Sequence, residues 1–348
     1  MTQPFLDDLP CPDRFATEEA LEDYLAAPSR DLVRDLARVE GDLLILGVGG
    51  KMGPSLARLA RNATPGRRVI AVARFSEAGV RESLEAHGVE TIACDLLDAA
   101  ALAALPQCAN VVFMAGRKFG ADANHPLTWA MNAYVPALVA QAFRRSRIVA
   151  FSTACVYPFV PVTSQGADES LPPDPPGEYA QSCVARERMF EYFSQQHGTP
   201  GRLFRLSYAI DMRYGVLVDV ATKVWRGDPV DVTMGHVNVI WQGDANAQAL
   251  RCLAVATTPT SPLNVSGPET LSIRWLAEEF GRRFARPVSI TGQEAPTAWL
   301  MNTTAAESLF GYPRTPLLRQ VSWVADWVAR EQRLYNKPTK FEKRDGRY

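Results

Sequence analysis

Short apolar runs alternate with amphipathic stretches along the first two thirds of the chain. The first run, Leu-Leu-Ile-Leu at 43–46, is too short for a helix and is bounded by glycines, so it predicts a buried strand of a parallel sheet. Further runs of this kind occur at 69–73, 91–93, 111–114, 148–151 and 203–206. Helical patterns separate them, at 55–61, 78–87, 98–105, 128–143 and 180–195. This strict alternation predicts an α/β fold built on a doubly wound parallel sheet.

Composition and charge exclude several classes of protein. The 348 residues are 47% hydrophobic and 22% charged, which is the balance of a globular protein. Lys and Arg total 37 against 38 Asp and Glu, so we expect neither a nucleic-acid partner nor a membrane surface. The chain has no long apolar run, and its acidic N-terminus does not resemble a signal peptide, so we expect a cytoplasmic protein. The cysteines form no C-x-x-C pair and the histidines share no ligand spacing, so we expect reduced thiols and no metal site.

A glycine-rich turn follows the first predicted strand. Gly47, Gly50 and Gly53 have G-x-x-G-x-x-G spacing, and Pro54 suits the first turn of the helix that follows. Such a turn lets the backbone approach a pyrophosphate and directs the free N–H groups of a helix N-terminus at it. The turn therefore predicts a Rossmann dinucleotide site. We expect it to contain Gly47, Gly49, Gly50, Lys51, Met52 and Gly53.

The alternation weakens after residue 207, and this predicts a division of the chain. Eight prolines between 229 and 316 break the later part into short pieces, as in a smaller, irregular lobe. The last twelve residues, from Lys337, include five basic and two acidic residues, so we expect a solvated or loosely docked tail. The expected parts are an N-terminal helical extension (1–40), a Rossmann domain (41–206), a mixed substrate-binding lobe that returns to the Rossmann core (207–335) and a basic tail (336–348).

Two positions bear on the choice of cofactor. A carboxylate at the end of the second strand would bind the ribose hydroxyls of NAD, but the chain has Arg74 there. An arginine at this place suits a 2′-phosphate, so we expect NADP to be favoured over NAD. Asp95 follows the third strand, where it could hydrogen-bond the adenine.

Taken in order, these motifs resemble the extended short-chain dehydrogenase/reductase superfamily, the NAD-dependent epimerases and dehydratases. The resemblance covers about residues 42–330. After the glycine turn it rests on Asp95-Leu96, Ala115-Gly116, Asn132, 152–157, 179–182, 239–244 and 263–267. It implies that the cofactor site also contains Leu96, Ala115, Gly116, Lys118, Asn132 and Tyr179.

The resemblance also implies an active site. Thr153 matches the family's Ser/Thr, which hydrogen-bonds the reacting oxygen. Tyr179 matches the tyrosine whose phenol passes a proton while hydride moves to or from the nicotinamide. Segment 207–216 follows the sixth strand at the sheet edge that meets substrate. We therefore expect Ser152, Thr153, Tyr208 and Arg213 to contact the substrate.

One departure from the family pattern concerns the proton transfer. A phenol has a pKa near 10, so it needs a nearby cation to act as a base around neutrality. In the family this cation is a lysine four residues after the tyrosine, but the chain has Cys183 there. Three alternatives remain open. Arg117 or Lys118 supplies the charge, Tyr179 acts only as an acid or hydrogen-bond donor, or the protein binds a dinucleotide without catalysis.

Two further departures concern the substrate. Ala154 and Cys155 occupy the places of an Asp-Glu pair found in the related dehydratases, so we do not expect a dehydration. Val237 occupies the place of an arginine that holds a substrate diphosphate, although Arg213 or Arg226 could replace it. We therefore expect a small carbohydrate-like substrate, such as a free sugar or sugar acid.

The combined expectation is an NAD(P)-dependent oxidoreductase or epimerase that acts on a sugar-like or polyol carbonyl or alcohol by hydride transfer. The alternative is a non-catalytic dinucleotide-binding regulator or scaffold on the same fold. The predicted helices at 128–143 and 180–195 have wide apolar faces. The resemblance implies that such helices pair two subunits, so we expect a homodimer.

Overall fold

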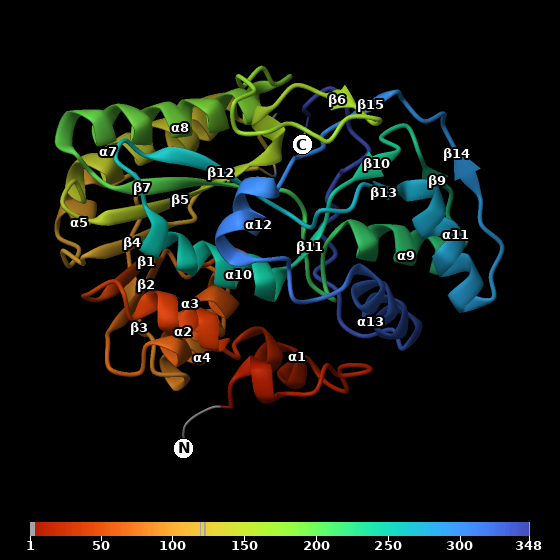
Figure 1. Ribbon diagram of the computed structural model, residues 1–348, viewed down its shortest axis with the longest axis horizontal. Helices are drawn as coiled ribbons and strands as arrows, with labels where there is room; N and C mark the ends of the chain where they lie inside the picture. Colours follow the sequence, from red (N-terminus) through yellow and green to blue (C-terminus); the bar gives the residue numbers. More distant parts are fainter. Residues whose placement is uncertain (1–3, 119, 122, 348) are drawn as a thin grey trace.

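A parallel sheet of seven strands forms the centre of the computed structural model, which describes residues 4–118, 120–121 and 123–347 (Figure 1). Its strand order is β12-β7-β5-β4-β1-β2-β3. The strands are β1 (Leu43–Leu46), β2 (Val69–Ala73), β3 (Glu90–Ala93), β4 (Asn110–Phe113), β5 (Arg147–Thr153), β7 (Gly201–Leu206) and β12 (Ser261–Val265). The order reverses direction between β1 and β4, which places a crevice beyond the carboxyl ends of these two strands. The structure confirms the expected Rossmann α/β fold with a C-terminal lobe.

Helices cover both faces of the sheet (Figure 1). Leu43 and Ile45 of β1 pack into the core beneath one face, whereas Leu44 and Leu46 pack into the core on the other, as side chains alternate along a strand. The first face carries α2 (Arg30–Leu36), α3 (Gly53–Ala63), α4 (Val80–Ala86) and α10 (Gln242–Arg251). The other carries α5 (Ala99–Ala103), α7 (Val135–Ala142) and α8 (Glu178–His197).

The helix expected at 128–143 is not regular. It consists of α6 (His125–Trp129), a π-helical turn at Ala130–Tyr134 and α7. Pro136 lies in the first turn of α7 and has no N–H, so it cannot donate the regular i→i−4 bond to the carbonyl of Asn132. Asn132 therefore lies in a π turn, a feature found often at functional sites.

The N-terminal extension joins the two lobes. It contains the 3₁₀ turn η1 (Leu6–Asp8), α1 (Glu18–Leu25) and α2. Ser29 caps α2, because its hydroxyl accepts a hydrogen bond from the backbone N–H of Leu32 (3.2 Å). Whereas α2 packs in the sheet core, Leu21 and Leu25 of α1 pack in the core of the C-terminal lobe.

The C-terminal lobe is built from helices and two-residue strand pairs, as its prolines predicted. Its helices are α9 (Val216–Arg226), α11 (Ile273–Phe284), α12 (Thr304–Phe310) and α13 (Leu317–Ala329). The strand pairs are β8 (Ala209–Ile210) with β11 (Ile240–Trp241), β9 (Val230–Asp231) with β14 (Ile290–Thr291), β10 (His236–Val237) with β13 (Leu271–Ser272), and β6 (Val160–Pro161) with β15 (Thr297–Ala298). Short 3₁₀ turns lie at η3 (Ala154–Val156) and η4 (Cys252–Val255).

The C-terminal segment, residues 333–347, is docked on the molecule, so the expectation of a solvated or loosely docked tail is wrong. Thr339 and Phe341 are each only 1% exposed. The backbone N–H and the hydroxyl of Thr339 both donate to the carboxylate of Asp219, at 2.8 and 2.5 Å. Farther along, Arg344 donates to the carbonyl and hydroxyl oxygens of Thr297. One apolar anchor and these polar contacts hold the segment despite its basic composition.

Over the part of the chain that the structure describes, no helix combines the length and apolarity needed to cross a bilayer. Nor do the described His, Cys, Asp and Glu side chains form a group of three or more that could hold a metal ion. The six cysteines are free thiols.

Candidate active site

A cavity of about 1170 Å³ lies at the carboxyl ends of the central strands. It is larger than the roughly 300–1,000 Å³ typical of small-molecule sites. In this fold ligands bind at the crevice where the strand order reverses. The wall contains the glycine turn (47–53), the segments that follow β4 and β5, and Tyr179 at the start of α8. It also contains segments 206–209 and 213–215 and residues 335–340 of the C-terminal segment.

The glycine turn has the geometry of a phosphate cradle. A Cβ at Gly47, whose φ is +89°, would lie 2.5 Å from the backbone nitrogen of Ala115. A Cβ at Gly53 would lie 2.0 Å from the carbonyl oxygen of Val48. Packing therefore requires these two glycines, whereas Gly49 and Gly50 are exposed and line the cavity. The N-terminus of α3, formed by Gly53 and Pro54, lines the same cavity and directs the positive end of the helix dipole toward it. These residues fit the pyrophosphate of a dinucleotide.

Four lysines line this cavity. Lys51 lies in the glycine turn, with Nζ 3.0 Å from the centre of the Tyr214 ring. Burial, followed by the charges of Lys118 and Lys337, lowers the pKa of Lys51 to about 7. Lys340 also lines the wall. Because these like charges converge on one space, an anionic ligand would relieve their repulsion.

Thr153 and Tyr179, the expected catalytic pair, both line the cavity. Thr153 ends β5, and its hydroxyl accepts a hydrogen bond from the backbone N–H of Cys155 (3.2 Å). Tyr179 lies in the first turn of α8 and is 9% exposed. Burial, with Cys183 and Cys155 acting in the same direction, raises the pKa of Tyr179 well above its usual value, while Arg186 opposes the shift. In this environment Tyr179 is a protonated donor at neutral pH.

Ser152 lines the cavity, but its hydroxyl has an internal partner. It donates to Oε1 of Glu187 (2.5 Å), a residue that is fully buried on α8. Arg205 on β7 donates to both oxygens of the same carboxylate. Ser152 therefore fixes the end of β5 next to Thr153, and its bond to Glu187 gives it a structural role.

Asn132 organises the loop after β4. Its side chain accepts from the backbone N–H of Arg117 (2.8 Å) and donates to the carbonyl of the same residue (3.0 Å). It also donates to Ser182 on α8 and accepts from Arg186. Asn132 itself is fully buried and does not line the cavity. It acts by holding the loop that carries Gly116 and Lys118.

Several residues predicted for the cofactor site do not line the cavity. Asp95 is exposed, and its carboxylate accepts a hydrogen bond from the backbone N–H of Leu97 (3.0 Å), which closes a local turn. Leu96 and Ala115 are buried in the sheet core. Arg74 is exposed and also lies outside the lining. The other predicted cofactor residues, Gly47, Gly49, Gly50, Lys51, Met52, Gly53, Gly116, Lys118 and Tyr179, do line it.

The two residues predicted after β7 differ in their surroundings. Tyr208 lines the cavity with a positive φ of 30°. Arg213 also reaches the lining, but its guanidinium pairs with the carboxylates of Asp211, Glu18 and Glu22. These ion pairs tie α1 to the C-terminal lobe. Since Arg213 also lines the cavity, its contact with the substrate stays a prediction. Arg226, the other arginine considered for a diphosphate, is exposed and lies outside the lining.

Sequence reasoning missed three parts of the wall. They are the carboxylates of α1, Trp299 and the C-terminal segment. The lysines in the C-terminal segment were the available signal, but basic residues near the end of a sequence are usually solvated. Their position over the cavity depends on contacts with Asp219, which lies 120 residues away along the chain.

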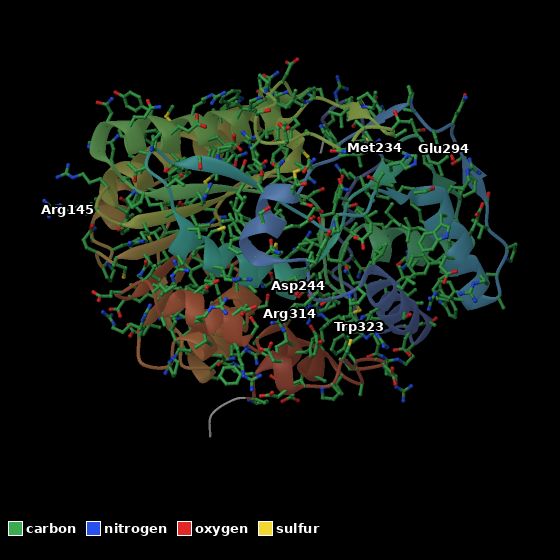
Figure 2. The ribbon with its side chains drawn as sticks, in the orientation of Figure 1. Arg145, Met234, Asp244, Glu294, Arg314 and Trp323 are labelled. Carbon is green, nitrogen blue, oxygen red and sulfur yellow. The ribbon has the colours of Figure 1, made fainter. Side chains whose placement is uncertain are left out.

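Asp244 ends the hydrophobic run at 239–244 and lies outside the large cavity. Its carboxylate accepts from the backbone N–H of Thr315 (2.9 Å), and Figure 2 shows Arg314 beside it. Burial raises the pKa of Asp244 to about 6, against the effect of Thr315 and Arg314. Asp244 thus fastens α10 to the chain that leads into α13.

Comparisons with known proteins agree with this architecture. The sequence model of the NAD dependent epimerase/dehydratase family matches residues 43–210. No curated protein sequence matches the chain. Among solved structures, MoeE5 in complex with UDP-glucuronic acid and NAD has a TM-score of 0.69 at 18% identity, over 84% of this chain and 100% of that one.

Two further structures are similar to the same extent. The UDP-glucose 4-epimerase of Thermus thermophilus, in complex with NAD, has a TM-score of 0.67 at 19% identity, over 82% of this chain and 98% of that one. DesIV from Streptomyces venezuelae, a dTDP-glucose 4,6-dehydratase with NAD and TYD bound, has a TM-score of 0.70 at 19% identity, over 83% of this chain and 97% of that one. At these identities the likeness shows a shared fold.

The expectation that NADP is favoured over NAD is wrong. The three similar structures hold NAD. The expectation rested on Arg74, which is exposed and does not line the cavity, so its position makes no pocket for a 2′-phosphate. The glycine turn, Thr153 and Tyr179 all lie within residues 43–210, the segment that the model of the NAD dependent epimerase/dehydratase family matches.

Proposed function

We propose that the protein is an NAD-dependent oxidoreductase or epimerase that acts on a sugar-like alcohol or carbonyl. The observation that carries this proposal is that the glycine turn, Thr153 and Tyr179 line one cavity. The glycine turn thus lies beside the Thr153 hydroxyl and the Tyr179 phenol, which can both hydrogen-bond a substrate oxygen. The family match over residues 43–210 supports an enzyme of this class.

The glycine turn and the first turn of α3 would hold the NAD pyrophosphate, with Lys51 adding positive charge. When bound, NAD supplies the hydride chemistry. Thr153 orients the substrate oxygen by a hydrogen bond. Tyr179 donates its proton to that oxygen as the carbon is reduced and receives it back when the alcohol is oxidised.

The cavity favours a sugar that carries an anionic group. Lys337 and Lys340 line the wall contributed by the C-terminal segment. Arginines that could have bound a diphosphate are committed elsewhere, since Arg213 is ion-paired and Arg226 lies outside the lining. Lysine is a flexible point charge that can take a carboxylate or a phosphate. The sugar acids and nucleotide sugars named in the similar structures are the first compounds to test.

The test separates cofactor binding from turnover. Titration of the intrinsic tryptophan fluorescence measures NAD affinity. An absorbance assay at the reduced nicotinamide band measures net oxidation or reduction of candidate sugars, and NMR of the sugars measures epimerisation, which leaves no net reduced nicotinamide. We expect Tyr179→Phe to lower kcat by about 10²-fold or more and to leave NAD affinity within about threefold. Absence of NAD binding in the unmodified protein, or full activity in Tyr179→Phe, contradicts the proposal. NAD binding with no turnover across the sugar panel favours a non-catalytic regulator.

We also propose a homodimer that pairs α7 and α8. Two aromatic side chains on this side of the sheet, Tyr134 and Tyr192, are 53% and 52% exposed. Exposed aromatic groups of this size are enriched at interfaces between subunits. Sedimentation velocity should give about twice the 38.3 kDa mass of the chain, whereas a monomer contradicts the pairing.

A further inference from the structure

The proposed function leaves one electrostatic question at Tyr179. Burial raises the pKa of its phenol, which makes ionisation harder. One helical turn along α8, its side-chain partner is Cys183, a thiol whose own pKa is also raised by burial. A thiol in this state carries no positive charge. A phenol that must both give and regain a proton near neutrality needs a cation close by.

Charged and titratable groups of three elements lie near Tyr179. α8 contributes Cys183 and Arg186, and η3 contributes Cys155. The loop after β4 contributes Lys118, whose Nζ lies 5.9 Å from the centre of the Tyr179 ring. Lys118 lines the same cavity as Tyr179 and Thr153.

Arg186 is already committed to the scaffold. Its Nη1 donates to the backbone carbonyl of Phe151 (2.9 Å), and its Nη2 donates to Asn132 (2.8 Å). A Cβ at Gly116 would lie 2.5 Å from Nη2 of Arg186, so the loop packs directly against this guanidinium and has no room for a side chain there. Arg186 is thus fixed beneath the loop and does not line the cavity, whereas Lys118 does.

Lys118 is held at both ends. Asn132 clamps the backbone N–H and carbonyl of the preceding residue, Arg117. At the tip, the Lys118 ammonium lies 3.5 Å from the backbone carbonyl oxygen of Thr339, to which it donates. Thr339 is in turn fastened to Asp219 by two hydrogen bonds. The C-terminal segment therefore positions the end of this side chain.

We propose that Lys118, positioned by Thr339 of the C-terminal segment, supplies the positive charge that allows Tyr179 to exchange its proton. This charge comes from the loop after β4, on a side chain that lines the cavity, and adds to that of the buried Arg186 on α8. Burial, with Lys340 acting in the same direction, lowers the pKa of Lys118, while Cys155, Cys183 and Asp219 oppose this shift. Lys51, whose pKa Lys118 itself lowers, shares the cavity. This inference rests on the proposed function.

The first experiment moves the charge to another element. Lys118→Met keeps most of the length of the unbranched side chain and removes its charge. We expect kcat to fall by about 10-fold or more, and the acid limb of the pH–rate profile to move up by about one pH unit or more. Adding Cys183→Lys to Lys118→Met restores a cation one helical turn from Tyr179 and should recover most of both effects. Lys118→Arg should retain more activity than Lys118→Met. The control is Lys343→Met, an exposed lysine of the C-terminal segment outside the cavity, which should behave as the unmodified protein.

The second experiment reads Tyr179 directly and needs neither NAD nor substrate. Protein labelled with ¹³C at the tyrosine ring carbon that bears the hydroxyl is titrated by NMR, with Tyr179→Phe to assign the signal. We expect Tyr179 to ionise at higher pH in Lys118→Met, and to return in the double variant. An unchanged titration of Tyr179, or no rescue by Cys183→Lys, overturns the role of Lys118. If Lys118→Met does not fold, the same titration of Lys118→Gln decides.

The two proposals fail in different ways. If NAD binds and turnover is normal in Lys118→Met, the role of Lys118 is wrong and the proposed function stands. If NAD does not bind the unmodified protein, the proposed function is wrong, and the NMR titration still decides whether Lys118 acts on Tyr179.

Discussion

Arg205 and Glu187 form a bidentate ion pair inside the molecule, with N–O distances of 2.9 and 2.6 Å and side chains 3% and 0% exposed. Arg205 lies on β7 and Glu187 on α8, the helix that carries Tyr179. Ser152, next to Thr153, donates to the same carboxylate. The pair therefore sets the position of the Tyr179 helix relative to the strand end that carries Thr153.

Glu187→Gln should destabilise the protein by about 3–5 kcal/mol, because it leaves the buried Arg205 guanidinium without a counter-charge. The free energy of unfolding, measured by urea denaturation followed by circular dichroism, checks this. The control is Glu191→Gln on the same helix, where Arg188 is 54% exposed and the loss should stay below about 1 kcal/mol. Equal losses in the two variants contradict the role given to the buried pair.

Asp244 predicts a specific dependence of stability on pH. Its pKa is about 6 in the folded protein, because of burial, and about 3.9 in an unfolded chain. Between these values the folded state binds more protons, so the Asp244 contribution falls as pH rises from 4 to 6 and stays low above that. Asp244→Asn remains neutral throughout. Relative to this variant, the unmodified protein should lose about 2–3 kcal/mol of unfolding free energy between pH 4 and pH 7. A constant difference across this range contradicts the assignment.

Gly53→Ala should damage the phosphate cradle, because the added Cβ would lie 2.0 Å from the carbonyl oxygen of Val48. We expect NAD affinity to fall at least about 10-fold and the melting temperature to drop, since the turn must shift to remove the overlap. Fluorescence titration and a thermal melt measure the two effects. Gly66→Ala is the matched control, because no atom lies within 4 Å of its added Cβ. Unchanged NAD affinity in Gly53→Ala would show that the turn does not hold the cofactor.

Thr339→Val removes the hydroxyl that donates to Asp219 and should loosen the C-terminal segment. Trypsin can then reach the lysines and arginines between 337 and 347 more readily. Mass spectrometry should show cleavage there at least about fivefold faster than in the unmodified protein. Ser308→Ala, which removes an exposed hydroxyl bond on α12, should leave the cleavage rate unchanged. Equal cleavage in Thr339→Val would mean that the anchor lies elsewhere.

The elements that the sequence predicted well are those determined by local pattern. The apolar runs at 43–46 and 69–73 have the same bounds as β1 and β2, because a strand buried on both faces is a continuous run of apolar residues in the sequence. The glycine turn was also local, since its spacing already contains the geometry that the close contacts of Gly47 and Gly53 require.

The parts that sequence could not place depend on residues far apart in the chain. Arg213 suited a substrate ligand on a polar loop, but it pairs with Glu18, which lies 195 residues earlier. The basic composition of the C-terminal segment indicated solvent, yet Phe341 is buried and Thr339 has two bonds to Asp219. A sequence pattern contains no information about such long-range pairs. The ion pairs of Arg213 and the docking of the C-terminal segment were therefore not predicted.

The pairing of β12 with β7 has a consequence for how the molecule can be divided. The chain leaves the sheet after β7, builds α9 and several short strands of the C-terminal lobe, and returns to add β12 at the edge. It then leaves again to build α11, α12 and α13. The N-terminal extension connects the two lobes a second time, because α2 packs in the sheet core and α1 packs in the core of the C-terminal lobe. No single cut in the backbone therefore frees one lobe with a complete core. Fragments that end near residue 210 would lack both the edge strand β12 and the contacts of α1 with the C-terminal lobe. The two lobes should therefore be expressed and engineered as one unit.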